Sequence, residues 1–221
     1  MKTKFLHIAT ALLFAGFTSS CSDFLDRYPL DELSDSSFWK TENDAMMAVT
    51  DIYGCLPTWD QDEDINSDNA VHGIKWAAGN ISKGIYDPMD QSWAGSYTPI
   101  RQCNLVLEKV KDIEMSDESR KKIEGQAYFF RGFVYFNLIR SFGDVPYIDK
   151  PLNLTDVEDI TRTPREEVYA KVMADFDKAI EYLPEEWDAA NTPRVTKGAA
   201  LAMKARAALY YNNWQVAADA V

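Results

Sequence analysis

Residues 116–146 of the chain have the sequence SDESRKKIEGQAYFFRGFVYFNLIRSFGDVP, and the architecture follows from this stretch. Ser116 is a favourable N-cap, and apolar residues then recur every three or four positions. This spine consists of Ile123, Ala127, Phe130, Val134 and Leu138. Gly143 tolerates the left-handed conformation that ends a helix, and Pro146 prevents its continuation. The spacing therefore predicts one long helix that ends near Phe142.

Aromatic side chains make this helix apolar on almost every side. They are Tyr128, Phe129, Phe133, Tyr135 and Phe136. A helix with so little polar surface has to be enclosed by its neighbours. The sequence therefore predicts further elements packed around it.

Helices are also predicted before this stretch. Thr41, with Asp44 three residues later, is typical of a capped helix start. The apolar stripe that follows contains Ala45, Val49, Ile52, Tyr53 and Leu56. A second helix is indicated by Leu105, Val106 and Val110, and it is expected to begin between Ser92 and Ile100.

Three more helices are predicted after it. Thr163-Pro164-Arg165-Glu166 matches a capping box with Pro164 at the first helical position. The stripe of that helix contains Val168, Val172, Phe176, Ile180 and Leu183, and Pro184 ends it. Thr196 is the expected cap of an alanine-rich helix that runs to Tyr210. Asn212 and Asn213 interrupt the chain before a last helix, which starts at Trp214 and is cut off at Val221.

The predicted fold class is all-α. Paired helices with short connections and interlocking alanines are typical of a tetratricopeptide-like helical-pair scaffold, an alpha-alpha superhelix, although the strict 34-residue consensus is not visible. No stretch alternates with period two as a strand does. A long segment from Pro57 to Pro99, with weak periodicity, follows the first helix. Long irregular segments of this kind are more often functional than mere connections.

Composition excludes several classes of function. The chain has 221 residues, 46% of them hydrophobic, which is typical of a globular protein. Its 23 basic and 35 acidic side chains give a net charge of −12, which argues against nucleic-acid binding. Two histidines and three cysteines are too few for a multi-histidine metal site or a disulfide scaffold. No catalytic residue, metal site or cofactor is predicted.

The N-terminus is predicted to be a targeting sequence. Lys2 and Lys4 precede the apolar run from Phe5 to Phe17. A helix over that run would rise about 20 Å, too little to cross a bilayer core of about 30 Å. Cys21 follows small polar residues and resembles the lipidated cysteine of a bacterial lipoprotein box, although Thr18 departs from the usual leucine. The predicted divisions are a signal peptide at 1–20, a lipidated segment at 21–40 and a helical domain at 41–221.

The mature chain is expected to touch the membrane through its lipid alone. Cleavage removes Lys2 and Lys4 and no acidic residue, which leaves 21 basic against 35 acidic side chains and a net charge of −14. A body this acidic avoids anionic headgroups. Two alternatives stay open for Cys55 and Cys103, which can pair outside the cytoplasm or remain as buried thiols.

Together these features resemble the SusD-like (RagB/SusD) family of lipoproteins. The segments that match are spread over almost the whole chain. They are CSDFLD at 21–26, Phe38-Trp39, WAGSYTPIRQCN at 93–104, AYFFRG at 127–132, FGDVP at 142–146, and Arg194 with Thr196-Lys197. Phe129 and Gly132 stand where the family commonly has leucine and alanine. Because family members are roughly twice this long, the sequence is expected to be an N-terminal portion.

The resemblance implies a function in nutrient capture. It implies an outer-membrane lipoprotein that faces the cell exterior, binds glycans or another nutrient without catalysis, and delivers them to a SusC-like TonB-dependent transporter. Ligand contacts in the family come partly from the segment after the first helix. Rough alignment from Asp68 implies a role for Trp76, with Asn80 four residues later. Trp59, Asp68 and Asn69 complete the predicted ligand-binding set, whereas Trp93 and Tyr97 are expected to precede a helix in structural roles.

Two other functions remain as alternatives. One is a tetratricopeptide-like adaptor that binds only proteins. The other is a glycoside hydrolase, for which paired carboxylates such as Asp62 and Asp64 would be needed. The acidic run 60–68 does not fit an EF-hand, because Ile65 and Val71 occupy the positions that need glycine and glutamate. A solvated acidic loop is the default, and a calcium site of another type stays open.

Overall fold

The structure is a computed structural model that describes residues 38–57, 91–156 and 160–220. One compact unit begins at Trp39 and contains the described helices. These helices are α3 (Glu42–Ile52), α4 (Gln91–Lys109), α5 (Asp117–Phe142), α6 (Arg165–Tyr182), α7 (Lys197–Tyr210) and α8 (Trp214–Asp219). Three short 3-10 turns accompany them: η2 (Tyr53–Cys55), η5 (Val110–Asp112) and η6 (Leu154–Asp156). The all-α prediction is confirmed for this part of the chain.

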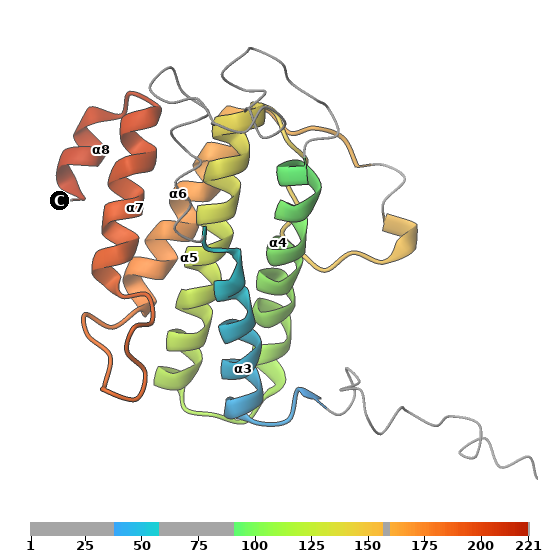
Figure 1. The fold of residues 1–221 in the computed structure, drawn as a ribbon, viewed down its shortest axis with the longest axis vertical. Coiled ribbons are helices and arrows are strands. Elements are labelled where there is room, and N and C mark those ends of the chain that lie inside the picture. Colours follow the sequence, from blue (N-terminus) through green and yellow to red (C-terminus); the bar gives the residue numbers. More distant parts are fainter. Residues whose placement is uncertain (1–37, 58–90, 157–159, 221) are drawn as a thin grey trace, which may run out of the picture. The chain divides into compact units, whose positions relative to one another are not determined.

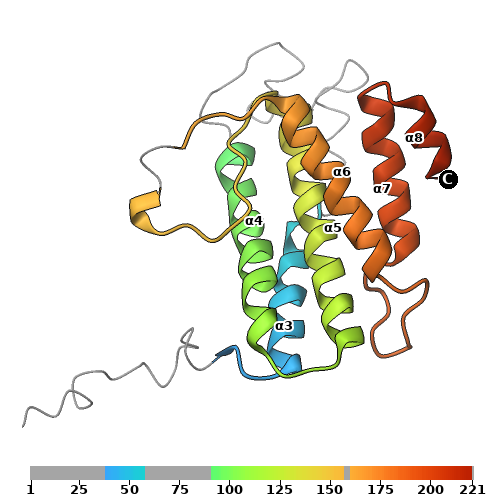
Figure 2. The same cartoon turned by 180° about the vertical axis from the view of Figure 1, so that it is seen from behind.

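The long central helix is surrounded as its sequence requires. α5 contacts α3, α4, α6 and α7, and α8 packs on α7. From α4 to α8, successive helices run in opposite directions, with their connections at alternating ends (Figures 1 and 2). Phe130, Tyr135 and Phe136 of α5 are almost completely buried. The paired-helix architecture therefore follows from the apolar surface of residues 123–139.

Close approach of α6 to α5 depends on two glycines. A Cβ atom added at Gly125 would lie 3.0 Å from Cβ of Tyr182 and 3.1 Å from Cγ of Leu183. A Cβ atom at Gly132 would lie 3.1 Å from the Phe176 ring. The small residues of α5 thus form the surface on which α6 rests.

Most predicted caps are present. Thr41 and Asp44 form a complete capping box, in which the Thr41 N–H donates to Oδ2 of Asp44 at 2.8 Å. The hydroxyl of Ser116 accepts from the Ser119 N–H at 3.0 Å, and that of Thr196 accepts from the Ala199 N–H at 3.4 Å. Gly143 ends α5 with a positive φ of 70°. These contacts satisfy backbone groups that a helix end leaves unpaired.

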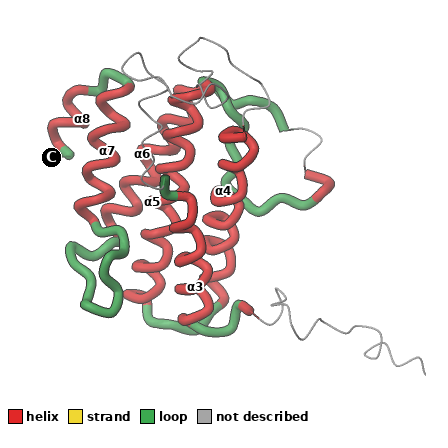
Figure 3. The backbone as a smooth tube through the Cα atoms, in the orientation of Figure 1, coloured by secondary structure: helices red, strands yellow, loops and turns green. Residues whose placement is uncertain are grey.

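The capping box predicted at Thr163 is wrong. α6 begins at Arg165, Pro164 is its N-cap, and no side chain of the cap residue bonds to the helix. Thr163 instead forms an isolated bridge with Val145, and its hydroxyl accepts from the Tyr147 N–H at 3.3 Å. Asp144 caps the helix from the preceding loop, since its Oδ1 accepts from the Arg165 N–H at 3.0 Å. Apart from this bridge, the described residues contain no strand (Figure 3).

Two smaller expectations also need correction. α4 begins at Gln91, near the expected start, and Trp93 and Tyr97 lie inside the helix rather than before it. Leu56 belongs to the predicted stripe of α3 but is 38% exposed, because the helix gives way to η2 at Tyr53 and its periodicity ends there. Ala45, Val49 and Ile52 are buried as predicted.

Candidate functional site

The five residues predicted to bind ligand lie outside the described residues. They are Trp59, Asp68, Asn69, Trp76 and Asn80, all within the segment 58–90. The predicted lipidation site Cys21 and the acidic run 60–68 also lie outside them. The structure does describe both attachment points of segment 58–90. Pro57 follows η2, and Gln91 is the first residue of α4.

Residues close in sequence to both attachment points line one cavity of about 460 Å³. We call it the α3–α4–α5 cavity after the helices around it, with η2 completing the wall. Its lining residues are Asp51, Gly54, Cys55, Gly95, Ser96, Thr98, Pro99, Gln102, Phe133, Val134 and Asn137. Cys55 comes two residues before Pro57, and Gly95 comes four residues after Gln91. Segment 58–90 is therefore joined, at each end, to a stretch of chain that contributes residues to this cavity.

The cavity combines amide, carboxylate and aromatic groups. Nε2 of Gln102 donates a hydrogen bond to Oδ2 of Asp51, which links α4 to α3. The Asn137 amide is half-buried, and no described residue forms a side-chain hydrogen bond with it. Phe133 stacks on Phe129 with ring centroids 6.3 Å apart. These groups can bind a polar ligand that also has an apolar face.

Burial favours the protonated form of the two cysteines near the cavity. Both are free thiols in the structure, which matches the buried-thiol alternative. Burial raises the pKa of the Cys55 thiol to about 11, so it stays protonated at neutral pH. Cys103 is completely buried, and this burial raises the pKa of its thiol further above the ordinary range. Burial thus disfavours, in both cysteines, the thiolate form that covalent catalysis needs.

Aromatic contacts hold the first turns of α4 in place. The Trp93 ring meets the Phe142 ring edge-on at 5.1 Å, and the Arg162 guanidinium lies 4.9 Å from the Trp93 ring centroid. The Tyr97 hydroxyl donates to the carbonyl oxygen of Pro146 at 3.0 Å. Burial raises the pKa of Tyr97 to about 12, so this hydroxyl remains a donor. The contacts give Trp93 and Tyr97 structural roles, as the sequence predicts, although inside the helix.

A buried polar network joins α4, α5 and α6. Arg131 donates to both carboxylate oxygens of Asp175, at 2.8 Å from Nε and 2.6 Å from Nη2. Its Nη1 donates to Oδ1 of Asn104 at 2.9 Å, and Asn104 in turn donates to the Ile148 carbonyl oxygen at 2.9 Å. Burial lowers the pKa of Arg131, but the Asp175 carboxylate outweighs this effect and raises it. The network is fully paired, so its role is to fix the helices.

A second set of contacts ties the loop after α6 to α3 and α5. Arg194 donates to Oε1 of Gln126 at 3.2 Å and to Oγ1 of Thr50 at 3.0 Å. The Tyr53 hydroxyl donates to the same Gln126 oxygen at 2.8 Å and accepts from the Val195 N–H at 2.9 Å. A smaller cavity of about 280 Å³ lies beside Arg194. Because Arg194 already donates to Gln126 and Thr50, we interpret its role as structural.

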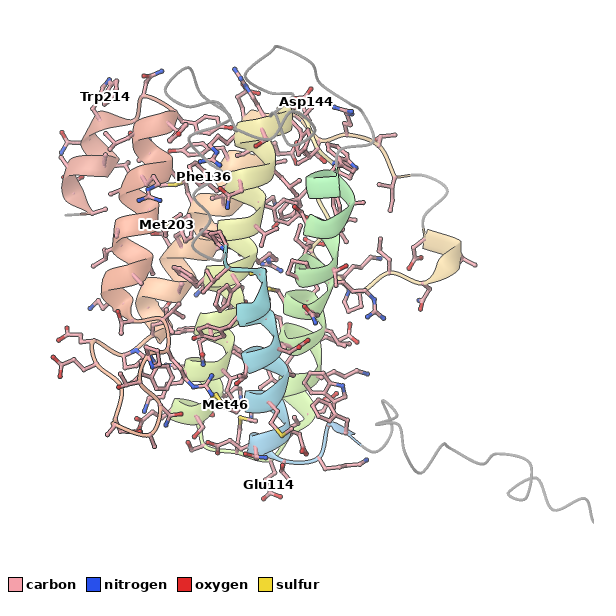
Figure 4. The ribbon with its side chains drawn as sticks, viewed as in Figure 1. Met46, Glu114, Phe136, Asp144, Met203 and Trp214 are labelled. Atoms are coloured by element: carbon pink, nitrogen blue, oxygen red, sulfur yellow. The ribbon has the colours of Figure 1, made fainter. Side chains whose placement is uncertain are left out.

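The described residues provide neither a metal-binding cluster nor a helix that could span a membrane. No group of three or more histidine, cysteine, aspartate or glutamate side chains in them could hold a metal ion. No helix among them has the length and apolar character needed to cross a bilayer. Exposed aromatic side chains occur at the end of α7 and the start of α8, where Tyr210 and Trp214 are 56% and 62% exposed. Figure 4 shows Trp214 at the start of α8.

Sequence reasoning missed the polar residues of the α3–α4–α5 cavity. Asp51, Gln102 and Asn137 come from three helices, and no local motif joins them. One signal was present in the sequence, because Pro99 lies within the range near which a helix was predicted to begin, four residues after Gly95. A proline at that place leaves a carbonyl without its helical partner.

Comparison with known families gives a match over most of the chain. The family model described as starch-binding and associating with the outer membrane matches residues 23–209. SusD-like protein P2 of Formosa agariphila is 29% identical over 99% of this chain and 45% of its own length. A SusD-like protein of Bacteroides ovatus is 26% identical over 97% of this chain and 40% of its own length. The chain thus spans about half the length of these relatives or less.

Solved structures agree on the fold. The crystal structure of a SusD-like protein from Bacteroides fragilis is 28% identical, with a TM-score of 0.77 over 88% of this chain and 40% of that one. A laminarin-binding SusD-like protein is 23% identical, with a TM-score of 0.71 over 82% of this chain and 42% of that one. The likeness supports the helical scaffold predicted from the sequence.

Proposed function

The chain belongs to the SusD-like family of outer-membrane-associated, starch-binding proteins, and from this premise we propose that it captures glycans at the cell surface for uptake. The observation that supports this most is the family match over residues 23–209. The frame described above agrees with it. Helices that pack tightly around α5 hold both attachment points of a segment rich in tryptophan and amide side chains. A preformed frame reduces the entropy lost when a ligand binds.

The proposed ligand contacts lie in segment 58–90. Trp76 and Trp59 would present flat apolar faces to the C–H faces of pyranose rings, and Asn80, Asp68 and Asn69 would pair with hydroxyl groups. Trp93 cannot serve in the same way, because Phe142 and Arg162 already cover its ring. The division between structural and ligand-facing tryptophans is therefore part of the proposal.

Delivery to a partner completes the proposed function. The bound glycan would pass unchanged to a SusC-like TonB-dependent transporter, so the chain would supply binding and no bond cleavage. Modest affinity suits such a role, since a delivered ligand also has to leave. The chain would stay at the membrane through acyl chains on Cys21, each buried CH₂ contributing about 0.8 kcal/mol, while the acidic body faces the cell exterior.

Native affinity electrophoresis tests glycan capture. The chain from Ser22 onward is run in gels that contain starch, laminarin or other neutral and acidic polysaccharides. We expect at least one polysaccharide to retard it, and Trp76→Ala or Trp59→Ala to abolish the retardation. Trp214→Ala is the matched control, because Trp214 is exposed on α8 and belongs to no proposed contact. Retardation by no polysaccharide in the panel would contradict glycan capture.

One observation favours a protein-binding adaptor as a second function. Leu209, Tyr210 and Trp214 are 50%, 56% and 62% exposed at the junction of α7 and α8. Exposed apolar side chains that gather in this way often mark a protein interface. The adaptor predicts that no polysaccharide retards the chain and that Trp214→Ala weakens partner binding, which is opposite to the outcome expected for glycan capture.

A further inference from the structure

We propose that the α3–α4–α5 cavity is a binding subsite for one neutral sugar unit of the captured glycan. This inference rests on the proposed function and adds a location and a ligand class to it. All groups that carry it belong to described residues of α3, η2, α4 and α5. The cavity volume of about 460 Å³ lies within the range of about 300–1,000 Å³ that is usual for small-molecule sites.

The cavity offers the mixture of surfaces that a pyranose ring needs. Phe133 and Val134 of α5 give it an apolar part, and Asp51, Gln102 and Asn137 give it a polar part. The hydrogen bond from Gln102 to Asp51 fixes the positions of both side chains before a ligand arrives. Carboxylate and amide groups bind adjacent hydroxyls in pairs, as donors and acceptors in fixed planes.

Asn137 is the polar group with the most unused capacity. Its amide carries two donor hydrogens and one acceptor oxygen, and no described residue bonds to them. The residue lies one helical turn after Phe133 on α5, and both line the cavity. The amide is only half-buried, so its donors and acceptor are accessible to a ligand that enters the cavity.

A backbone acceptor adds to this set. Pro99 lies inside α4 and has no N–H, so the carbonyl oxygen of Gly95, four residues earlier, lacks its helical partner. Gly95 and Pro99 both line the cavity. No described atom lies within 4 Å of the place where a Gly95 Cβ would stand, so the helix surface at Gly95 is open. The backbone here can accept a hydrogen bond from a sugar hydroxyl.

Charge selects the ligand class. Among the described residues that line the cavity, Asp51 is the acidic side chain and none is a lysine or arginine. The whole chain carries a net charge of −12. A uronate or sulfate group placed in this cavity would face a like charge and no cation, whereas a neutral unit would meet hydrogen-bonding groups of both kinds. The cavity therefore fits a neutral sugar and disfavours an acidic one.

Calorimetric titration of the chain from Ser22 onward tests the inference, with maltohexaose and laminarihexaose as neutral probes and hexagalacturonate as the acidic probe. We expect wild type to bind a neutral probe, and Asn137→Leu to weaken that binding about tenfold, since the leucine keeps the shape and removes the hydrogen bonds. Asn43→Leu, on the opposite end of α3, is the matched control and is expected to bind as wild type does. Asp51→Asn is expected to reduce discrimination against hexagalacturonate. Circular dichroism establishes that each variant is folded.

The outcomes separate the subsite from the proposed function. If Trp76→Ala abolishes neutral-probe binding and Asn137→Leu leaves it unchanged, the cavity is not a subsite and glycan capture stands. If wild type prefers hexagalacturonate, the assignment of a neutral ligand is wrong and glycan capture again stands. If wild type binds none of the three probes and no polysaccharide retards it in gels, both the subsite and the proposed function fail.

Discussion

Replacing Asp175 by asparagine should destabilise the protein far more than the same change at Asp177, two residues along the same helix. Asp175 makes a bidentate pair with Arg131, in which the side chains are 6% and 9% exposed. Asp177 pairs with Lys204 at 2.6 Å, but its side chain is 59% exposed. Removing one partner of a buried pair costs about 3–5 kcal/mol, because the other charge is left uncompensated. Breaking an exposed pair costs about 0.2–1 kcal/mol.

Urea unfolding followed by circular dichroism measures this difference directly. Asp175→Asn should lower the free energy of unfolding by about 3 kcal/mol or more, and Asp177→Asn by less than about 1 kcal/mol. In thermal unfolding, the first variant should lose roughly 6–20 °C in Tm, at about 2–4 °C per kcal/mol for a domain of this size. The double variant Arg131→Met with Asp175→Leu should recover most of the loss, since no unpaired charge remains.

A difference of less than about 1 kcal/mol between Asp175→Asn and Asp177→Asn would refute the reasoning. It would mean that Arg131 finds solvent or another acceptor when its partner is lost, and that α4, α5 and α6 are not fixed by this network. Equal losses in the single and double variants would refute it in another way, because packing rather than charge compensation would then set the cost.

Three further predictions follow from local geometry. Gly125→Ala should destabilise the protein by about 1–3 kcal/mol in urea unfolding, because the new Cβ would lie 3.0 Å from Cβ of Tyr182. Gly95→Ala, where nothing lies within 4 Å of the new Cβ, should be neutral or stabilising by up to about 1 kcal/mol. A larger loss of stability in Gly95→Ala than in Gly125→Ala would contradict the packing of α5 on α6. Iodoacetamide at pH 8 should modify Cys55 about 100-fold more slowly in the folded protein than after unfolding. The reason is that a pKa raised from 9.0 to about 11 lowers the thiolate fraction by that factor. Equal modification rates in mass spectrometry would contradict the burial of the Cys55 thiol. Asp144→Ala should cost about 1 kcal/mol in urea unfolding because α6 loses its cap, and no change would show that the bond to the Arg165 N–H contributes nothing.

Local sequence was sufficient for the helices and most of their ends. α5 begins after Ser116 and ends before Gly143, as predicted, since N-capping and a C-terminal residue with positive φ act within a few residues. The start of α6 could not be predicted in the same way. Thr163 and Pro164 have the residue types of a capping box, but Thr163 pairs with Val145. Asp144 caps the helix instead, and it lies 21 positions before Arg165 in the sequence. A long-range contact thus outweighed a local motif.

The candidate site was less accessible to sequence reasoning than the fold. The α3–α4–α5 cavity gathers Asp51, Gln102 and Asn137 from helices that the sequence separates by tens of residues, and each is an ordinary polar residue by itself. Trp93 shows the opposite case. Its structural role was predicted from its pattern, but its position inside α4 depends on Phe142 and Arg162, which contact it only in the folded unit. The predicted roles of Trp59 and Trp76 remain predictions.

The most direct test of the central claim is a binding titration with the polysaccharide that retards wild type most strongly in gels. The proposed function predicts saturable binding by the chain from Ser22 onward, loss of binding in Trp76→Ala or Trp59→Ala, and unchanged binding in Trp214→Ala. The polysaccharide should be recovered without new reducing ends, because capture involves no cleavage. Absence of saturable binding, or equal affinity in all three tryptophan variants, would contradict glycan capture through segment 58–90.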